Sequence, residues 1–335
     1  MRTDIAFKTE DGVTLHGWHS VPSAEAKLVP TIVMAHGFGA LKEMYLDRFA
    51  DAFALAGLAS LVFDHRGFAD SEGAPRQEVD PWQQIRDYRD AITFAETLEA
   101  TDPTRIGIWG SDYSGGHALV VGAIDRRVRC VVAQVPMVSG HANVRRLVRP
   151  DFFSTLQRLF EQDRRARLAG RAPAMVAVVS EDSGQPSALR NDEAFDWYSD
   201  AGRALAPARR NEVTLRSVEM FSEYEPGAYA RYVSPTPLLM VVALKDTLTV
   251  TDLALEAFEN ALEPKTAGDA GGRAFRCVCA GFRGGERGGG WVVLRVVGGG
   301  IGKRKESCGA ALDKLEASRL GVLRATAADL HFCLL

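Results

Sequence analysis

The segment that most constrains the fold is residues 106–117 (IGIWGSDYSGGH), where a short apolar run passes through small residues into a helical pattern. A turn of the G-x-S-x-G kind needs small neighbours, because its central residue is held in a strained strand-to-helix turn above the edge of a sheet. The positive end of the following helix lies beside that central side chain. Here the central residue is Asp112. We therefore predict a carboxylate nucleophile at position 112; Ser111 and Ser114 are weaker candidates because neither lies at the apex.

Short apolar runs alternate with helical patterns through much of the chain. Asp11-Gly12 between two apolar runs predicts an antiparallel hairpin at the start. Buried strands are predicted at residues 31–35, 59–63, 105–109 and 130–134, and helices at residues 44–56, 82–98 and 116–124. Strands that alternate with helices indicate an α/β fold whose mostly parallel sheet has helices on both faces.

Between residues 139 and 232 the strand signal fades, and helical stretches rich in arginine, 152–168 and 192–204, take its place. This is long for a connection within one domain, so we predict a helical lid inserted into the sheet domain. A strand at residues 237–243 and a helix at 251–262 then resume the core. The predicted parts are therefore residues 1–138 and 233–265 for the core and residues 139–232 for the lid.

Residues 266–335 differ from the rest of the chain in charge and composition. They contain 11 basic and 6 acidic side chains, a local charge of +5, which leaves −8 for residues 1–265. They also contain 15 of the 32 glycines. Two interpretations fit such a glycine-rich tail: a flexible basic extension, or translated non-coding sequence from a retained intron or a frameshift. We favour the second.

The overall charge excludes some classes of partner. A formal net charge of −3 gives no reason to expect binding to nucleic acid or to an anionic membrane. The chain has no apolar run of about 18 residues and no leader-like start, so we expect a cytoplasmic protein. Four of the five cysteines fall in the last seventy residues without a zinc or disulfide pattern, and we expect no metal and no cofactor.

Two further segments fit a site around Asp112. Residues 36–39 (HGFG) follow a predicted strand, where the backbone N–H of Phe38 could stabilise a developing oxyanion together with the N–H of Tyr113. Asp246 comes just after the strand that follows the lid. This is a suitable place for the acid that orients a catalytic histidine.

With these segments in order, residues 1 to about 265 resemble the α/β-hydrolase superfamily, and within it the dienelactone-hydrolase-like branch that includes fungal polyketide transferases. The matching segments are residues 36–43 (HGFGALKE), 63–67 (FDHRG), 110–117 (GSDYSGGH), 234–240 (SPTPLLM) and 245–249 (KDTLT). The resemblance implies hydrolysis or transfer of an acyl group by a nucleophile, an acid and a histidine, without a metal. It would assign Asp112 as nucleophile and Asp246 as acid. The histidine would follow a last strand, yet the only one after residue 265 is His331.

We therefore expect a hydrolase or acyltransferase of secondary metabolism that acts on a polyketide or another hydrophobic ester or thioester. The acyl group could be bound to a carrier or to coenzyme A, and Trp197 and Tyr224 of the lid could line its pocket. One alternative is an epoxide hydrolase or dehalogenase, because a carboxylate that attacks an sp3 carbon forms an ordinary ester, whereas attack on an acyl carbon forms an anhydride. Another is a ligand-binding protein without turnover. The oligomeric state and the identity of the substrate stay open.

Overall fold

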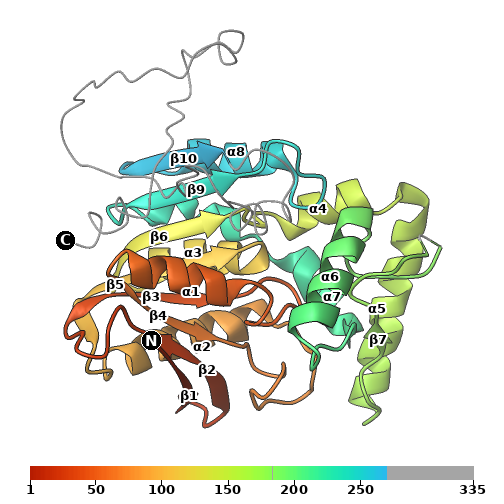
Figure 1. Cartoon of the computed structure of the whole chain (residues 1–335). Helices are drawn as coiled ribbons and strands as arrows, with labels where there is room; N and C mark the ends of the chain where they lie inside the picture. Colours follow the sequence, from red (N-terminus) through yellow and green to blue (C-terminus); the bar gives the residue numbers. More distant parts are fainter. Residues whose placement is uncertain (183, 270–335) are drawn as a thin grey trace.

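The computed structural model of the chain describes residues 1–182 and 184–269, which form an eight-stranded sheet with helices on both faces (Figure 1). The strand order is β1-β2-β4-β3-β5-β6-β9-β10, and only the β1–β2 and β2–β4 pairs are antiparallel. The strands are β1 (Arg2–Lys8), β2 (Thr14–Ser20), β3 (Val29–Ala35), β4 (Ala59–Phe63), β5 (Thr101–Ser111), β6 (Val128–Gln134), β9 (Leu238–Val242) and β10 (Lys265–Asp269). The predicted opening hairpin and mostly parallel sheet are confirmed.

Side chains that alternate along the strands build two apolar layers. In β3, Ile32 and Met34 face the layer under helix α1 (Leu46–Leu55), and Val33 faces the other layer. Helices α2 (Pro81–Ala95), α3 (Tyr113–Ile124) and α8 (Thr251–Asn260) cover that second face. These helices begin and end within a few residues of the predicted bounds, because their apolar residues recur with the helical period.

The predicted lid is mainly helical. It contains α4 (Gly140–Leu147), the 3-10 turn η1 (Pro150–Phe152), α5 (Phe153–Leu168), α6 (Asp192–Leu205) and α7 (Leu215–Glu223). These helices gather at one end of the sheet (Figure 1). Two short strands that the sequence did not predict, β7 (Met175–Val176) and β8 (Val213–Thr214), pair antiparallel within the lid.

Two boundaries differ from the sequence-based prediction. The last turn of the predicted lid, the 3-10 helix η2 (Pro226–Tyr232), packs against α3 and α8 of the core. The sheet also extends past residue 265, because β10 pairs in parallel with β9 as far as Asp269. Residues 266–269 therefore pair with the sheet; the other residues of the predicted glycine-rich tail, including His331, lie outside the described residues. In the described part of the chain no helix combines the length and the apolar character needed to cross a membrane.

Candidate active site

Asp112 lies at a sharp turn between the end of β5 and the start of α3. Its φ of 55° and ψ of −116° are strained for a residue with a side chain, at a cost on the order of 1–3 kcal/mol. The turn is crowded: a Cβ on Gly110 would lie 2.0 Å from the carbonyl oxygen of Ser114, and one on Gly116 would lie 2.5 Å from that of Met137. This crowding explains why the segment needs small residues around Asp112.

The Asp112 carboxylate lies against the two backbone N–H groups that the sequence predicts as oxyanion donors. The N–H of Phe38 donates to Oδ2 at 3.1 Å, and the N–H of Tyr113 lies close enough to the carboxylate to lower its pKa. Burial, with a smaller contribution from the negative charge of Asp246, raises the pKa of Asp112 to about 6, in spite of these two N–H groups. The structure therefore brings the predicted catalytic residues Asp112 and Asp246 and the predicted oxyanion donors together at the carboxyl ends of β3, β5 and β9.

The loop after β3 is shaped around the carboxylate. His36 accepts the N–H of Gly37 at Nδ1 (2.9 Å), and its Nε2 lies 2.8 Å from the carbonyl oxygen of Met44, to which it donates. Burial lowers the pKa of His36 to about 4, so the ring is neutral and serves the loop rather than proton transfer. A Cβ on Gly37 would lie 2.4 Å from Oδ2 of Asp112, so the carboxylate approaches the backbone as closely as only glycine permits.

Shortly after this loop, Lys42 forms a buried ion pair with Asp64. The backbone N–H of Lys42 donates to Oδ1 of Asp64 at 2.7 Å, and its ammonium group donates to Oδ2 at 2.5 Å. The side chains are 6% and 1% exposed, and Nζ also pairs with Glu43 at 2.8 Å. Because both charges are removed from water, each depends on the other for compensation.

Replacing Lys42 by methionine should lower the free energy of unfolding by about 3–5 kcal/mol at pH 8, because it leaves the Asp64 carboxylate buried without its cation. Burial already raises the pKa of Asp64 to about 6, and removal of Lys42 raises it further. A carboxyl group whose pKa is raised by folding destabilises the fold when it is ionised. Protonation of Asp64 at pH 5 should therefore restore part of the lost free energy of unfolding. Urea unfolding at both pH values measures this difference.

The exposed pair Lys27–Glu99, whose side chains are 71% and 80% exposed, provides the control, because Lys27→Met should change stability little at either pH. An equal loss for Lys42→Met at pH 5 and pH 8 would mean that the buried charge of Asp64 is not the cause.

Asp246 is the second buried carboxylate of the site. Its Oδ1 accepts the backbone N–H groups of Leu248 (2.8 Å) and Thr249 (3.1 Å), and the Thr249 hydroxyl donates to Oδ2. The side chain is thereby fixed by its own loop at the end of β9.

The histidines buried near the site have other partners. Nε2 of His65 lies 3.0 Å from the Ser114 hydroxyl, and His117 lies 2.9 Å from both the Tyr224 hydroxyl and Oε1 of Gln84. Burial lowers the pKa of His65 to about 3 and that of His117 well below its usual value. Within residues 1–182 and 184–269, no histidine hydrogen-bonds Asp112 or Asp246.

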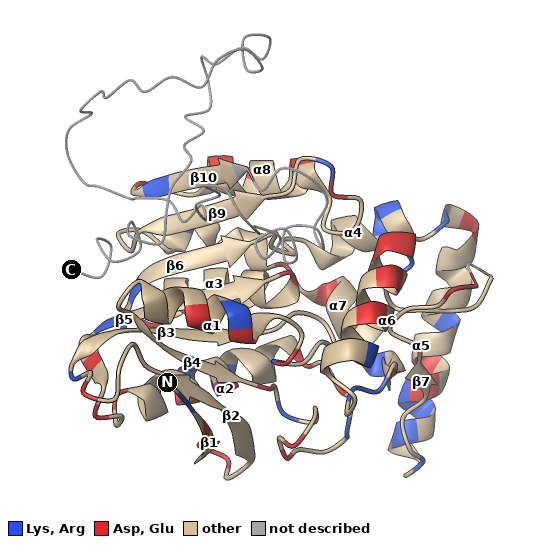
Figure 2. Cartoon of the chain, viewed as in Figure 1, with Lys and Arg blue, Asp and Glu red and all other residues tan. Residues whose placement is uncertain are grey.

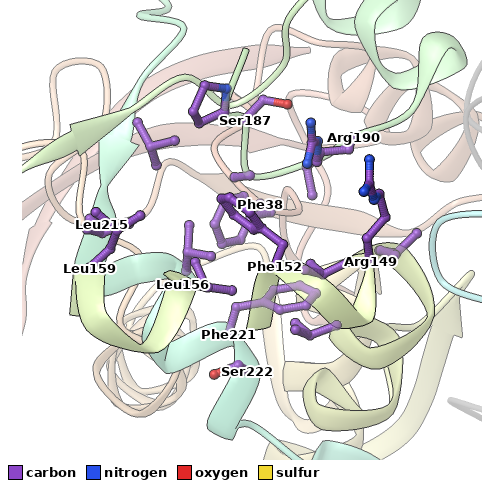
Figure 3. Close-up of a pocket in the computed structure, with 18 of the residues that line it drawn as sticks. Phe38, Arg149, Phe152, Leu156, Leu159, Ser187, Arg190, Leu215, Phe221 and Ser222 are labelled. Atoms are coloured by element: carbon purple, nitrogen blue, oxygen red, sulfur yellow. The ribbon is translucent and has the colours of Figure 1, made fainter. Parts of the chain in front are cut away.

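A cavity of about 420 Å³ lies between Phe38 and the lid, and most of the side chains that line it are apolar (Figure 3). They include Phe38, Leu147, Phe152, Leu156, Leu159, Leu215, Val218 and Phe221. Arg149 and Arg190 lie at one end of the cavity and Leu159 and Leu215 at the other (Figure 3). Phe38 links the cavity to the proposed site, because it lines the cavity and its backbone N–H donates to Asp112, which does not itself line the cavity.

The two predicted pocket residues lie elsewhere. Trp197 is buried against the ring of His36, with centroids 5.5 Å apart, and does not line this cavity. Tyr224 lines a different pocket of about 480 Å³, beside Trp82 and Arg164. Apolar residues of α5 and α7 form walls of the cavity instead. The sequence does not predict these wall residues, because the cavity exists only where the two helices meet the loop after β3.

The outer surface of the lid carries basic and acidic side chains close together (Figure 2). Arg164 pairs with Glu219 at 2.5 Å, and Arg167 pairs with Asp163 at 2.8 Å. No group of three or more His, Cys, Asp or Glu side chains suited to a metal ion occurs among the described residues.

Known proteins resemble this chain over most of its described residues. The family model described as X-Pro dipeptidyl-peptidase (S15 family) matches residues 11–269. The chain is 31% identical over 283 residues to a thiohydrolase from Eupenicillium brefeldianum, which covers 84% of this chain and 89% of that protein. It is 30% identical over 264 residues to the polyketide transferase grgF of Penicillium sp, covering 79% and 86%. The crystal structure of the α/β hydrolase GrgF from Penicillium sp. sh18 superposes with a TM-score of 0.72 at 28% identity, covering 82% of this chain and 91% of that one.

Proposed function

The chain belongs to the X-Pro dipeptidyl-peptidase (S15) family, has the α/β-hydrolase fold and is an enzyme of the hydrolase or transferase type; from this premise we propose that it cleaves or transfers the acyl group of a hydrophobic ester or thioester in secondary metabolism. The names of two relatives, thiohydrolase and polyketide transferase, support a thioester or polyketide substrate. The apolar cavity beside Phe38 supports a hydrophobic acyl group. A carrier or coenzyme A would hold the part of the substrate outside the cavity.

One observation carries the proposal: the Asp112 carboxylate lies at the strained turn and accepts the N–H of Phe38, the residue that also lines that cavity. In the proposed reaction an oxygen of Asp112 forms a bond to the acyl carbon, and the bond from that carbon to the thiol sulfur or alcohol oxygen breaks. The leaving thiolate or alkoxide takes a proton from solvent. Water or an acceptor hydroxyl then attacks the acyl carbon of the mixed anhydride, gives up a proton to solvent and returns Asp112 as a carboxylate. Asp246 would orient a catalytic histidine, which the described residues do not supply.

The position of Oδ2 favours a second candidate, attack on an sp3 carbon as in epoxide or haloalkane hydrolysis. The Phe38 N–H already holds Oδ2 of Asp112 itself, so a substrate carbonyl would have to displace it from that donor. If Oδ1 attacks an sp3 carbon, Oδ2 becomes the carbonyl oxygen of the resulting ester and keeps its hydrogen bond from Phe38. Water that attacks the Asp112 carboxyl carbon then places negative charge on Oδ2, where that donor stabilises it.

Single-turnover experiments with excess enzyme in H2(18)O distinguish the candidates. A medium-chain acyl thioester and a matched terminal epoxide serve as substrates, and mass spectrometry follows the product and the peptide that contains Asp112. Turnover of the thioester but not the epoxide supports acyl chemistry. Turnover of the epoxide with 18O in Asp112 and unlabelled product supports attack on the sp3 carbon. Saturable binding of either compound without turnover would contradict both and favour a ligand-binding protein.

Filling the cavity should change the preference for chain length. Leu156→Trp places a large ring among the apolar walls and should lower kcat/KM for long-chain substrates at least about tenfold, because burial of even one methylene contributes about 1–3 kcal/mol in such a pocket. Substrates with a two-carbon acyl group should be affected little. Steady-state kinetics with an acyl series measures both effects.

Leu168→Trp is the matched control, because Leu168 ends the same helix α5 and is 90% exposed. The cavity would not be the acyl site if Leu156→Trp and Leu168→Trp gave the same chain-length profile.

A further inference from the structure

The lid helix α6 contacts both loops that carry the proposed catalytic groups. Asn191 caps its N-terminus by accepting the N–H of Ala194 at 3.0 Å, and its amide donates to the Thr247 hydroxyl at 2.8 Å, one residue after Asp246. Two turns further along α6, the Tyr198 hydroxyl donates to the carbonyl oxygen of Phe38 at 2.5 Å. A single helix therefore connects the acid loop with the oxyanion loop.

The backbone around Phe38 needs such an anchor. Gly37 and Gly39 flank it, and Gly39 has a φ of +65°, so the segment has more conformational freedom than one built from other residues. Two polar contacts hold Phe38 itself: its N–H donates to Asp112, and its carbonyl accepts from Tyr198. During the proposed reaction the Asp112 carboxylate becomes an anhydride or ester and holds the N–H less strongly. The bond from Tyr198 does not change in that step.

Tyr198 is itself well fixed. Its side chain is 1% exposed, its ring packs at right angles to Trp197 with centroids 4.9 Å apart, and the Arg209 guanidinium lies 4.7 Å from the ring centroid. Burial raises the pKa of Tyr198, so the hydroxyl keeps its proton and acts as a donor throughout the neutral range. Trp197 also packs on His36, which begins the oxyanion loop. The hydroxyl therefore reaches Phe38 from a rigid support.

We propose that Tyr198 is a positioning residue for the oxyanion hole: its hydrogen bond to the Phe38 carbonyl aims the Phe38 N–H, so that the lid helix α6 must be docked for the hole to be complete. The inference rests on the proposed function, in which Phe38 is an oxyanion donor. It assigns to the lid a part in catalysis in addition to its part in binding.

Tyr198→Phe removes only the hydroxyl. We expect kcat to fall about tenfold or more and KM to change less than about twofold. Loss of a whole oxyanion donor lowers kcat by about 100- to 1,000-fold, and a misdirected donor keeps part of its effect. Thr31→Val is the control: it removes a buried hydroxyl bonded to Thr101 at 2.9 Å, near the amino end of β3 and away from the site. Both variants should lose thermal stability, whereas only Tyr198→Phe should lose kcat. An unchanged kcat for Tyr198→Phe at a lowered melting temperature would overturn the proposal.

A second measurement does not depend on turnover. In protein labelled with 15N-phenylalanine, the Phe38 amide should exchange with solvent at least about tenfold faster in Tyr198→Phe than in wild type, and its chemical shift should move, with neither change in Thr31→Val. Unchanged exchange and shift would overturn the inference even if the substrate class is wrong. Faster exchange in an enzyme that turns over no ester, thioester or epoxide would leave the positioning role supported and the proposed function refuted.

Discussion

Asp112→Asn should lower kcat at least about a thousandfold while substrate binding persists. The substitution keeps the size of the side chain but removes the negative charge, and a neutral amide is a poor nucleophile. Single substitutions of catalytic nucleophiles cost enzymes several orders of magnitude, since the rest of the site supplies only part of the rate enhancement. Steady-state kinetics on the best ester, thioester or epoxide substrate measures kcat, and calorimetry measures binding.

Ser111→Ala is the matched control at the neighbouring position. Ser111 ends β5, is 2% exposed and lies beside the apex of the turn, so its loss should leave kcat within a few-fold of wild type. The assignment of the nucleophile to Asp112 fails if Asp112→Asn keeps full turnover, and a loss of turnover in Ser111→Ala alone would move the nucleophile to the serine.

The sequence predicted the parts of the site that depend on local backbone chemistry. The small residues around Asp112 and the HGFG segment reflect close backbone approaches, which only short side chains permit, and the structure has those approaches at Gly110 and Gly37. Asp246 was predicted from its place after a strand, because the carboxyl ends of parallel strands meet at one edge of the sheet. Their roles as nucleophile and acid stay predictions.

The lid is predicted as a helical insertion with Trp197 and Tyr224 as pocket residues, but the sequence does not predict the residues that line the cavity beside Phe38. The cavity depends on how α5 and α7 pack over Phe38, and the apolar residues of an amphipathic helix look alike whether they face a core or a cavity. Trp197 and Tyr224 are predicted as pocket residues because large aromatic side chains often line pockets. Tyr198, next to Trp197 in the sequence, contacts the oxyanion loop through a hydrogen bond across 160 residues, and no local pattern predicts such a contact.

The end of the core was placed too early for a related reason. Residues 266–269 (TAGD) have weak strand propensity, yet they pair with β9 because neighbouring backbone supplies their hydrogen bonds. Tertiary context therefore determined this strand, whereas composition had suggested a boundary after Lys265.

Gly37→Ala should lower kcat by about 100- to 1,000-fold, the second largest effect expected. The added Cβ would lie 2.4 Å from Oδ2 of Asp112 and 3.0 Å from its Cγ, so the carboxylate must move away from the Phe38 N–H. The φ of Gly37 lies outside the left-handed region, so alanine fits the backbone itself and the clash falls on the carboxylate. The expected loss corresponds to removal of one oxyanion donor. Steady-state kinetics at saturating substrate measures it.

Gly107→Ala separates this effect from a general loss of packing. It creates a clash of similar size in the same part of the sheet, with a Cβ 2.7 Å from Sγ of Cys130, but on β5 before the turn. Both variants should therefore lose stability in urea unfolding, and only Gly37→Ala should lose most of its kcat. The two variants could instead lose kcat in proportion to their loss of stability. The close contact between Asp112 and the HGFG loop would then be a requirement of folding, and the catalytic role of the Phe38 N–H would have to be rejected.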